Sequence, residues 1–256
     1  MSESLLSSGA KPHEIGASLA RDTAAPAVAP QGADIWPTNA IRVVSVVLPS
    51  LFLAAILMQP VADPKLMFLD ALAAAEYADY CCRPYYGFVS TVGIMLWVAT
   101  AAVCLFSAIA FALARRARPV VLFAGAAGLL SGWLALDDAF LLHEVVLPHF
   151  GVAQNLVLAA NALFAIAYVG ASLRLIWTVD KWLLLLACGA LATSMGVDVV
   201  FHSLDPVLVY VEDSAKFFGI FCWASFHVTT MARLFLAPSA LETAATSAPA
   251  GAPARR

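Results

Sequence analysis

The chain has 256 residues, of which 62% are hydrophobic and only 12% are charged. An ordinary soluble domain carries about 25% charged residues, so this composition excludes a typical water-soluble protein. The net charge of −3 comes without a basic stripe that would neutralise phosphates, so we expect no nucleic-acid partner.

The two ends of the chain differ from its middle. Residues 1–38 and 238–256 are polar and contain many Ala, Pro and Ser residues. Such segments have too little apolar surface to offset the entropy lost on ordering. We therefore predict two disordered tails, one before and one after a membrane domain at residues 39–237.

Between the tails, apolar stretches recur that are long enough, at about 20 residues, to cross the hydrocarbon core as helices. The predicted spans are 41–59, 88–113, 119–147, 153–177, 182–203 and 214–236. The predicted fold is therefore all-α, a polytopic integral membrane bundle of six transmembrane helices in a lipid bilayer. Residues 60–87 are too polar to cross and contain several tyrosines, so we predict a short extracytoplasmic helix on the membrane surface.

The lysines and arginines predict the direction of the spans. Most of them, including Arg115 and Arg116, fall on the side that holds the N-terminus, and only Lys65, Arg83 and Lys216 fall on or near the other side. Because positive residues favour cytoplasmic loops, we expect both termini in the cytoplasm. The expected location is a bacterial-type inner membrane or plasma membrane.

The third predicted span ends in the stretch LALDDAFLLHEVVLPH, which runs from Leu134 to His149. Its ionisable residues include Asp137, Asp138, His143 and Glu144. The predicted topology brings residues of the fifth and sixth spans to the same end, namely Asp198, His202, Glu212, Asp213 and Lys216. A charged side chain costs at least about 2.5–3.5 kcal/mol at the centre of a membrane helix, so we expect these residues to face the bundle interior.

Neighbouring carboxylates repel each other unless they are protonated or neutralised by a cation. Carboxylates and imidazoles together suit a divalent transition metal such as Zn, Mn or Fe. The predicted metal ligands are Asp137, His143, Glu144, Asp198 and His202. Asp138 or Glu212 is the predicted general base acting on a metal-bound water.

Helical spacing refines this site. Asp137 and Glu144 are seven residues apart, so on a continuous helix they share a face at different depths. His143 lies about 100° around the helix from Glu144. The acidic and histidine side chains therefore cannot reach one point unless the helix is distorted, which Gly132 and Pro148 on either side would permit.

Each group also has a structural interpretation. The residues of the third span suit a solvated helix end. Asp198 and His202 suit a hydrogen-bonded packing pair. Glu212 stands four residues before Lys216, and Asp213 three, which are both salt-bridge spacings on one helix.

Three functions remain open at this point. The first is a metal-dependent enzyme, a hydrolase or oxidoreductase, that acts on a lipid or other apolar substrate in the extracytoplasmic leaflet. The second is a proton- or cation-coupled transporter or channel, although the cytoplasmic halves of the spans offer few polar residues, mainly Thr100, Asn161, His227 and Thr230. The third is an assembly subunit that binds a membrane-protein partner. His227 itself is predicted to be packed and hydrogen-bonded.

Overall fold

The structure is a computed structural model that describes residues 38–78, 83–201 and 206–236. The two predicted tails lie outside these residues, apart from Thr38. His202, one of the predicted metal ligands, also lies outside them. Every secondary-structure element in the described part of the chain is a helix.

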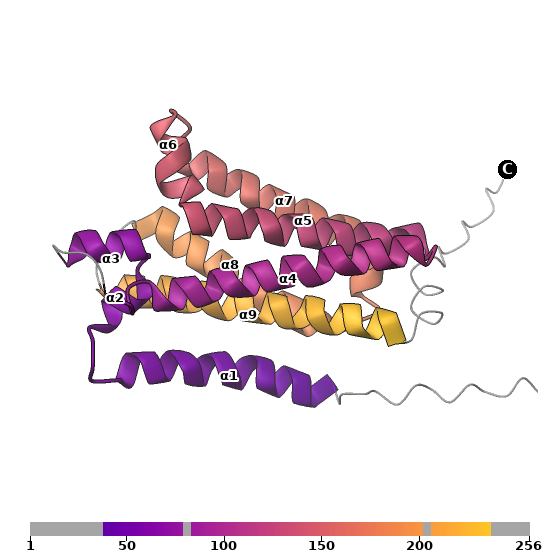
Figure 1. Cartoon of the computed structure of the whole chain (residues 1–256), viewed down its shortest axis with the longest axis horizontal. Helices are drawn as coiled ribbons and strands as arrows, with labels where there is room; N and C mark the ends of the chain where they lie inside the picture. Colours follow the sequence, from indigo (N-terminus) through magenta and orange to yellow (C-terminus); the bar gives the residue numbers. More distant parts are fainter. Residues whose placement is uncertain (1–37, 79–82, 202–205, 237–256) are drawn as a thin grey trace, which may run out of the picture. The chain divides into compact units, whose positions relative to one another are not determined.

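The long helices of the described chain run antiparallel to their neighbours in sequence (Figure 1). They are α1 Thr38–Met58, α4 Phe88–Leu113, α5 Arg118–Phe140, α7 Gln154–Ile176, α8 Lys181–Phe201 and α9 Pro206–Leu236. The short elements between them are α2 Pro64–Phe68, α3 Ala71–Tyr77, the π-helical segment η1 Leu142–Val146 and α6 Leu147–His149. Alternation in direction places α2, α3, η1 and α6 at one end of the bundle, which we call the acidic end.

Length and composition make α1, α4, α5, α7 and α8 candidate membrane spans among the described helices. Between 22% and 44% of the apolar window of each helix is buried, so more than half of each window is partly or fully exposed. A helix that is apolar on all sides fits lipid rather than water. The chain is therefore an integral membrane helical protein in contact with the bilayer.

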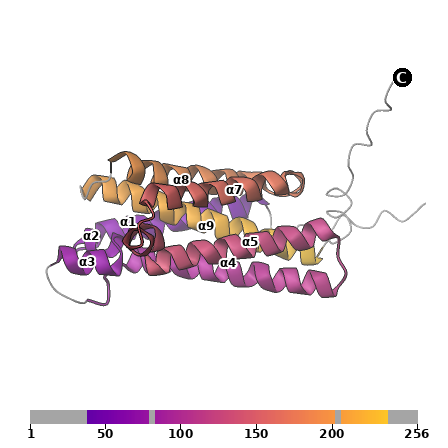
Figure 2. The same ribbon diagram turned by 90° about the horizontal axis from the view of Figure 1, so that it is seen from above.

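Two helix pairs, α4 with α5 and α8 with α9, pack closely along their lengths. Figure 2 shows α4 and α5 running beside each other. Glycines permit this approach, because a Cβ atom at Gly128 would lie 2.7 Å from Cγ of Leu105 and one at Gly219 would lie 2.8 Å from Cγ of Leu191. Small residues at such interfaces let membrane helices gain van der Waals contact, since burial of apolar surface from lipid stabilises little.

Aromatic and aliphatic side chains fill the space between these pairs. Trp97 of α4 and Trp223 of α9 meet edge to face, with ring centroids 5.9 Å apart, at the centre of the larger apolar cluster. A second cluster joins α1, α2 and the first part of α9 through Leu53, Phe68 and Phe217. The first helix is thus attached to the bundle through α9.

The opposite end of the bundle, which we call the basic end, is held by arginines. The Arg42 guanidinium donates two hydrogen bonds to the Asp180 carboxylate, at 2.8 and 2.9 Å. Arg116 donates to the carbonyl oxygen of Leu234 at 2.9 Å. Bidentate Arg–carboxylate pairing is geometrically specific, so it holds α1 against the α7–α8 connection.

The segment between α1 and α4 differs in detail from the single surface helix that the sequence predicts. It contains α2 and α3, and the Asp63 carboxylate caps α2 by accepting from the Lys65 backbone N–H at 2.9 Å. The Ser90 hydroxyl donates to Oδ1 of Asp70 at 2.7 Å and so links the beginning of α3 to α4. The position of this segment on a membrane surface stays a prediction.

Candidate functional site

The third predicted span does not continue to residue 147 as one α-helix. α5 ends at Phe140, Leu141 adopts a left-handed conformation with φ 50°, and the π-helical η1 follows. A non-glycine residue in this region is strained, and π-helical turns are frequent at functional sites. The expectation that Asp137 and Glu144 share one helical face is therefore wrong, and the break lies at neither Gly132 nor Pro148.

Asp137 stabilises this break. Its Oδ1 accepts a hydrogen bond from the backbone N–H of His143 at 2.9 Å, which satisfies a donor that the interrupted helix leaves without an α-helical partner. Its Oδ2 accepts from Nδ2 of Asn161 at 2.7 Å and lies 3.0 Å from Nδ1 of His143. Asp137 is only 3% exposed, so these contacts replace the hydrogen bonds to water that its carboxylate lost on burial.

His143, which lies beyond the end of α5, is held between two carboxylates. Its Nδ1 forms an ion pair with Asp137 whose angles fall outside those of a hydrogen bond, and its Nε2 lies 3.2 Å from Oε1 of Glu144. Burial lowers the pKa of His143, but the contacts and charges of Asp137 and Glu144 outweigh burial and raise it to about 10.

The same network reaches α7 through a residue that the sequence analysis placed among the polar groups of the cytoplasmic half. The Asn161 carbonyl oxygen accepts from Nε1 of Trp133 at 2.7 Å, while its amide donates to Asp137. The sequence could have indicated this role, because Asn161 is a single amide within an apolar stretch and a buried amide almost always has a hydrogen-bond partner.

Asp138 has different partners from Asp137. Its Oδ1 lies 2.9 Å from Nζ of Lys216, and its Oδ2 accepts from Nε1 of Trp97 at 3.1 Å. Sequence spacing allowed a pair of Lys216 with Glu212 or Asp213 on its own helix as a structural alternative, whereas this ion pair crosses to α5. Because both Asp138 oxygens are engaged, the predicted role of Asp138 as a general base has no support in this geometry.

The remaining predicted residues lie around the same end of the bundle. Asp198 of α8 accepts a hydrogen bond from Nε2 of Gln154 at 3.2 Å. Glu212 of α9 and Asp198 both line a groove that Asp137 and Glu144 also line. The structure therefore brings together the described members of the predicted site, although they pair with Lys, Asn, Gln and Trp side chains.

This groove has a volume of about 570 Å³ and lies between α5, α7, α8 and α9. The side chains at its acidic end are Asp137, Asp138, His143, Glu144, Asn161, Ser194, Asp198, Glu212 and Lys216. Farther from this end its walls are aliphatic or small, from Ala162 to Leu173 on α7 and around Cys188 and Leu191 on α8. Such a volume suits an organic ligand, since ligand pockets measure roughly 300–1,000 Å³.

The groove opens sideways toward the surroundings of the bundle. Two residues of its wall, Ile166 and Leu173, are 68% and 45% exposed. Gly170 also lines it, and a Cβ atom there would meet nothing within 4 Å. The apolar wall on α7 from Ala162 to Leu173 is about 16 Å long, which is about half of a hydrocarbon core of about 30 Å.

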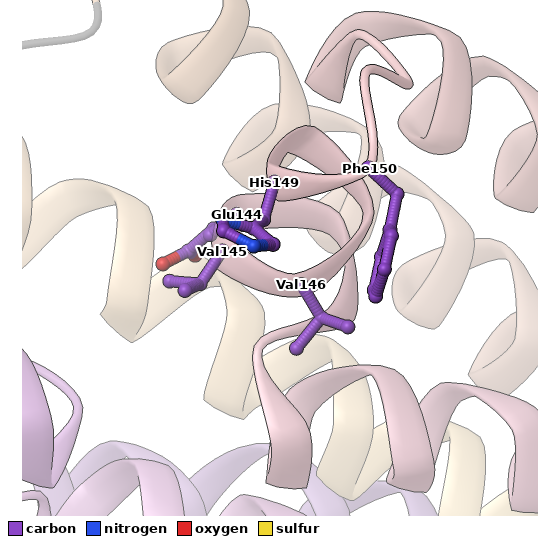
Figure 3. Close-up of a pocket in the computed structure, with 5 residues that line it drawn as sticks. All are labelled: Glu144, Val145, Val146, His149 and Phe150. Carbon is purple, nitrogen blue, oxygen red and sulfur yellow. The ribbon is translucent and has the colours of Figure 1, made fainter.

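A second hollow, of about 470 Å³, lies on the η1–α6 coil itself. Figure 3 shows its five lining side chains, Glu144, Val145, Val146, His149 and Phe150, projecting outward from this coil. His149, the last residue of α6, is exposed. This hollow is an open surface feature beside the mouth of the groove.

His227 is separate from the groove. It is fully buried in α9, its Nε2 lies 2.8 Å from the Tyr168 hydroxyl, and its Nδ1 lies 2.8 Å from the carbonyl oxygen of Trp223. The prediction that His227 is packed and hydrogen-bonded is confirmed.

Among the residues that the structure describes, no three His, Cys, Asp or Glu side chains form a group that could hold a metal ion. The predicted metal site included His202, which is outside the described part, so that site stays a prediction.

Comparisons with known proteins give one match. A family model described as "Domain of unknown function (DUF8692)" matches residues 40–230, which cover all the long helices described above except the last residues of α9 and the first of α1. The searches of curated proteins and of solved structures found no match. The groove and the network around Asp137 therefore carry the functional argument.

Proposed function

The chain belongs to the family described as Domain of unknown function (DUF8692), and we propose that it binds an amphiphile with one long apolar chain inside the membrane. In this proposal the apolar chain lies along α7 and α8, and the polar head group lies at the acidic end. The observation that carries the proposal is the change in the groove wall along its length, from carboxylates to aliphatic side chains.

The sideways opening supports lipid as the source of this ligand. Ile166 and Leu173 belong both to the groove wall and to the outward face of α7, so a chain enters from the bilayer without crossing water. The buried indoles of Trp97 and Trp223 close the inner side of the groove. Aromatic and aliphatic walls with a few polar groups at one end are typical of small-molecule sites.

The aliphatic part of the groove favours this function over ion transport. A path for protons or cations needs polar groups through the full depth of the bilayer. Beyond Asn161 and Ser194, the described wall toward the basic end consists of aliphatic residues, small residues, Cys188 and the indole of Trp223. An apolar chain fits this wall better than a hydrated ion does.

The proposal includes six spans with α9 as the sixth and both termini in the cytoplasm. α9 has 31 residues, about 46 Å at 1.5 Å per residue, and it runs closely along α8. Arg42, Arg116 and Arg233 lie at the basic end, and positive residues favour the cytoplasmic side. The head group then lies in the extracytoplasmic leaflet.

Tryptophan quenching tests this function directly. Trp97 and Trp223 line the groove and are 2% and 1% exposed, whereas Trp177 and Trp182 are exposed on the outside. Trp133 is also 37% exposed, so a variant with Phe at Trp36, Trp133, Trp177 and Trp182 is placed in bilayers containing phosphatidylcholine brominated in mid-chain. We expect strong quenching of the remaining fluorescence, because a brominated chain in the groove touches the buried indoles.

Two glycines provide a matched pair of further variants. Gly170→Leu places a side chain in the groove, whereas Gly189→Leu places the same side chain in open space on α8, away from the groove wall. Gly170→Leu should relieve the quenching and Gly189→Leu should not. Equal quenching in the two variants would show that the bromines reach the indoles from outside the groove, and the proposal would fail.

A further inference from the structure

The coil formed by η1 and α6 lies between the groove and the outside of the bundle. His143 and Glu144, near its beginning, line the groove. Glu144 also lines the outer hollow, together with the side chains that project outward from the coil in Figure 3. Two of these, Val145 and Phe150, are 48% and 76% exposed. The coil therefore separates the acidic end of the groove from the surroundings of the bundle.

A left-handed residue stands at each end of this coil. Gly151 has φ 85°, which glycine adopts without steric cost. Its backbone N–H donates to the carbonyl oxygen of Pro148 at 2.9 Å, so the end of the coil is a hydrogen-bonded turn. Leu141, at the other end, has φ 50° and carries a Cβ atom that crowds the backbone in this conformation. The strain is therefore at the α5 end.

The contacts that hold Leu141 in this conformation lie on the inner side of the coil. The Asp137 carboxylate accepts from the His143 backbone N–H at 2.9 Å and lies 3.0 Å from the imidazole, whose other nitrogen lies 3.2 Å from Glu144. We call Asp137, His143 and Glu144 the latch. A strained residue persists only where its surroundings hold it, so loss of the latch would let Leu141 return to the right-handed helical region.

A right-handed Leu141 would lengthen α5. Residues 133–147 contain no glycine or proline, and the sequence predicted one continuous helix here, over 119–147. Proline disfavours a helical conformation of the residue before it, so the longer helix would end near Leu147. The segment thus has two compatible backbone conformations, one broken at Leu141 and one continuous.

The chain is long enough to reach α7 in the continuous conformation. Asp137 and Asn161 lie at the same level, because they are hydrogen-bonded. Leu147 would lie about 15 Å beyond Asp137, and Gln154 begins α7 about 10 Å beyond Asn161. With helix axes about 8–10 Å apart, the gap is about 10 Å. Residues 148–153 can span about 20 Å.

We propose that the η1–α6 coil is a lid on the acidic end of the groove. In the closed state, which the structure describes, the latch holds Leu141 left-handed and the coil covers this end. In the open state α5 continues to about Leu147, His143 and Glu144 leave the groove wall, and the acidic end is open to water. The role of the lid rests on the proposed function, because it would let the head group of the amphiphile meet the aqueous phase while the apolar chain stays in the groove.

Quenching from the water side tests the lid. The variant that retains Trp97 and Trp223, which are both buried in the groove wall, is placed in bilayers without brominated lipid and titrated with acrylamide, a polar quencher. Leu141→Val should raise the quenching constant by about threefold or more, because a β-branched residue disfavours positive φ and so favours the open state. Leu142→Val is the matched control, since the φ of Leu142 is not positive, and it should leave the constant unchanged.

The two histidines of the coil test the latch. His143→Gln removes the imidazole between the carboxylates and should also raise the quenching constant, whereas His149→Gln alters an exposed residue of the outer hollow and should not. Adding Leu141→Gly to His143→Gln should restore the original constant, because glycine accepts the left-handed conformation and disfavours a continuous helix. Such a rescue also shows that His143→Gln leaves the bundle folded, and melting temperatures in detergent check the other variants.

The outcomes separate the lid from the proposed function. Unchanged acrylamide quenching in folded Leu141→Val and His143→Gln variants would overturn the lid. An equal rise in Leu142→Val or His149→Gln would overturn it too, because the cause would be a general loosening of the coil. The brominated lipid and Gly170→Leu are a separate readout. If they fail while the lid variants behave as expected, the lid stands and the amphiphile is wrong.

Discussion

The two sides of α8 differ in how closely they meet their neighbours. Toward α9, Gly219 removes the side chain that would keep the helices apart, and Leu191 packs into the space. Toward α7, Gly170 faces open space and the helices meet at only a few residues. Glycine thus permits close helix packing between α8 and α9, and it leaves space between α7 and α8. The groove is therefore compatible with a bundle that is well packed elsewhere.

The largest expected effect comes from the network that closes the acidic end. Asp137→Ala leaves a buried imidazolium and two hydrogen-bond donors without their partner, and it should lower the free energy of unfolding by about 3–5 kcal/mol. Denaturant titration in detergent measures this loss. Asp198→Ala at the open side should cost much less, and an equal loss for both would contradict the assigned network.

The next largest effect is expected from substitutions of Gly219 and Gly170. Gly219→Leu forces the new side chain against Leu191 and the Ala187 carbonyl, and we expect a loss of about 1–3 kcal/mol or more. Gly170→Leu should change stability by less than about 0.5 kcal/mol. Melting temperatures of the two purified variants make the comparison, and similar melting would remove the distinction between a closed and an open side.

A double-mutant cycle tests the ion pair between Asp138 of α5 and Lys216 of α9. Lys216→Met and Asp138→Asn, alone and combined, should show a coupling energy of about 1–2 kcal/mol because the groups form a partly buried pair. A parallel cycle of Lys216→Met with Glu212→Gln should show weaker coupling. If the second cycle gave the larger value, the pairing on one helix that sequence spacing allows would be the correct one.

The smallest effect concerns the packed interior away from the groove. Tyr168→Phe removes the hydroxyl that contacts His227 without changing the ring packing, and it should cost about 0.6 kcal/mol, an average for hydrogen bonds between membrane helices. Quenching by the brominated lipid should be unchanged in this variant. A changed quenching signal would mean that the interior and the groove are coupled.

Hydropathy alone was sufficient to predict an all-helical membrane protein, because lipid requires long apolar helices and their sequence signal is strong. The gathering of Asp137, Asp138, Asp198 and Glu212 at one end was also predictable, since antiparallel helices return each carboxylate to the same side. The number of spans between two carboxylates decides whether they lie on the same side, and this number can be counted in the sequence.

Three features of the site were not predictable in the same way. The break at Leu141 has no glycine or proline to mark it, and it depends on the Asp137 carboxylate accepting the His143 N–H. The partner of Lys216 depends on how α5 and α9 are rotated about their axes. Asn161 was visible as a polar residue, but its depth relative to Asp137 required the packing of α5 on α7.

The early end of α5 has a consequence for the bilayer around it. The uncharged stretch of α5 between Arg118 and Asp137 is about 27 Å long, whereas α4, its closest neighbour, has 26 residues without a charge, about 39 Å. Lipid beside α5 therefore meets a hydrophobic thickness shorter than the usual core of about 30 Å, and such mismatch is relieved by local thinning. Membrane thinned at this position would place the head groups of the surrounding leaflet at the depth of the Asp137 carboxylate. An amphiphile would then move between the leaflet and the protein with little change in the depth of its head group.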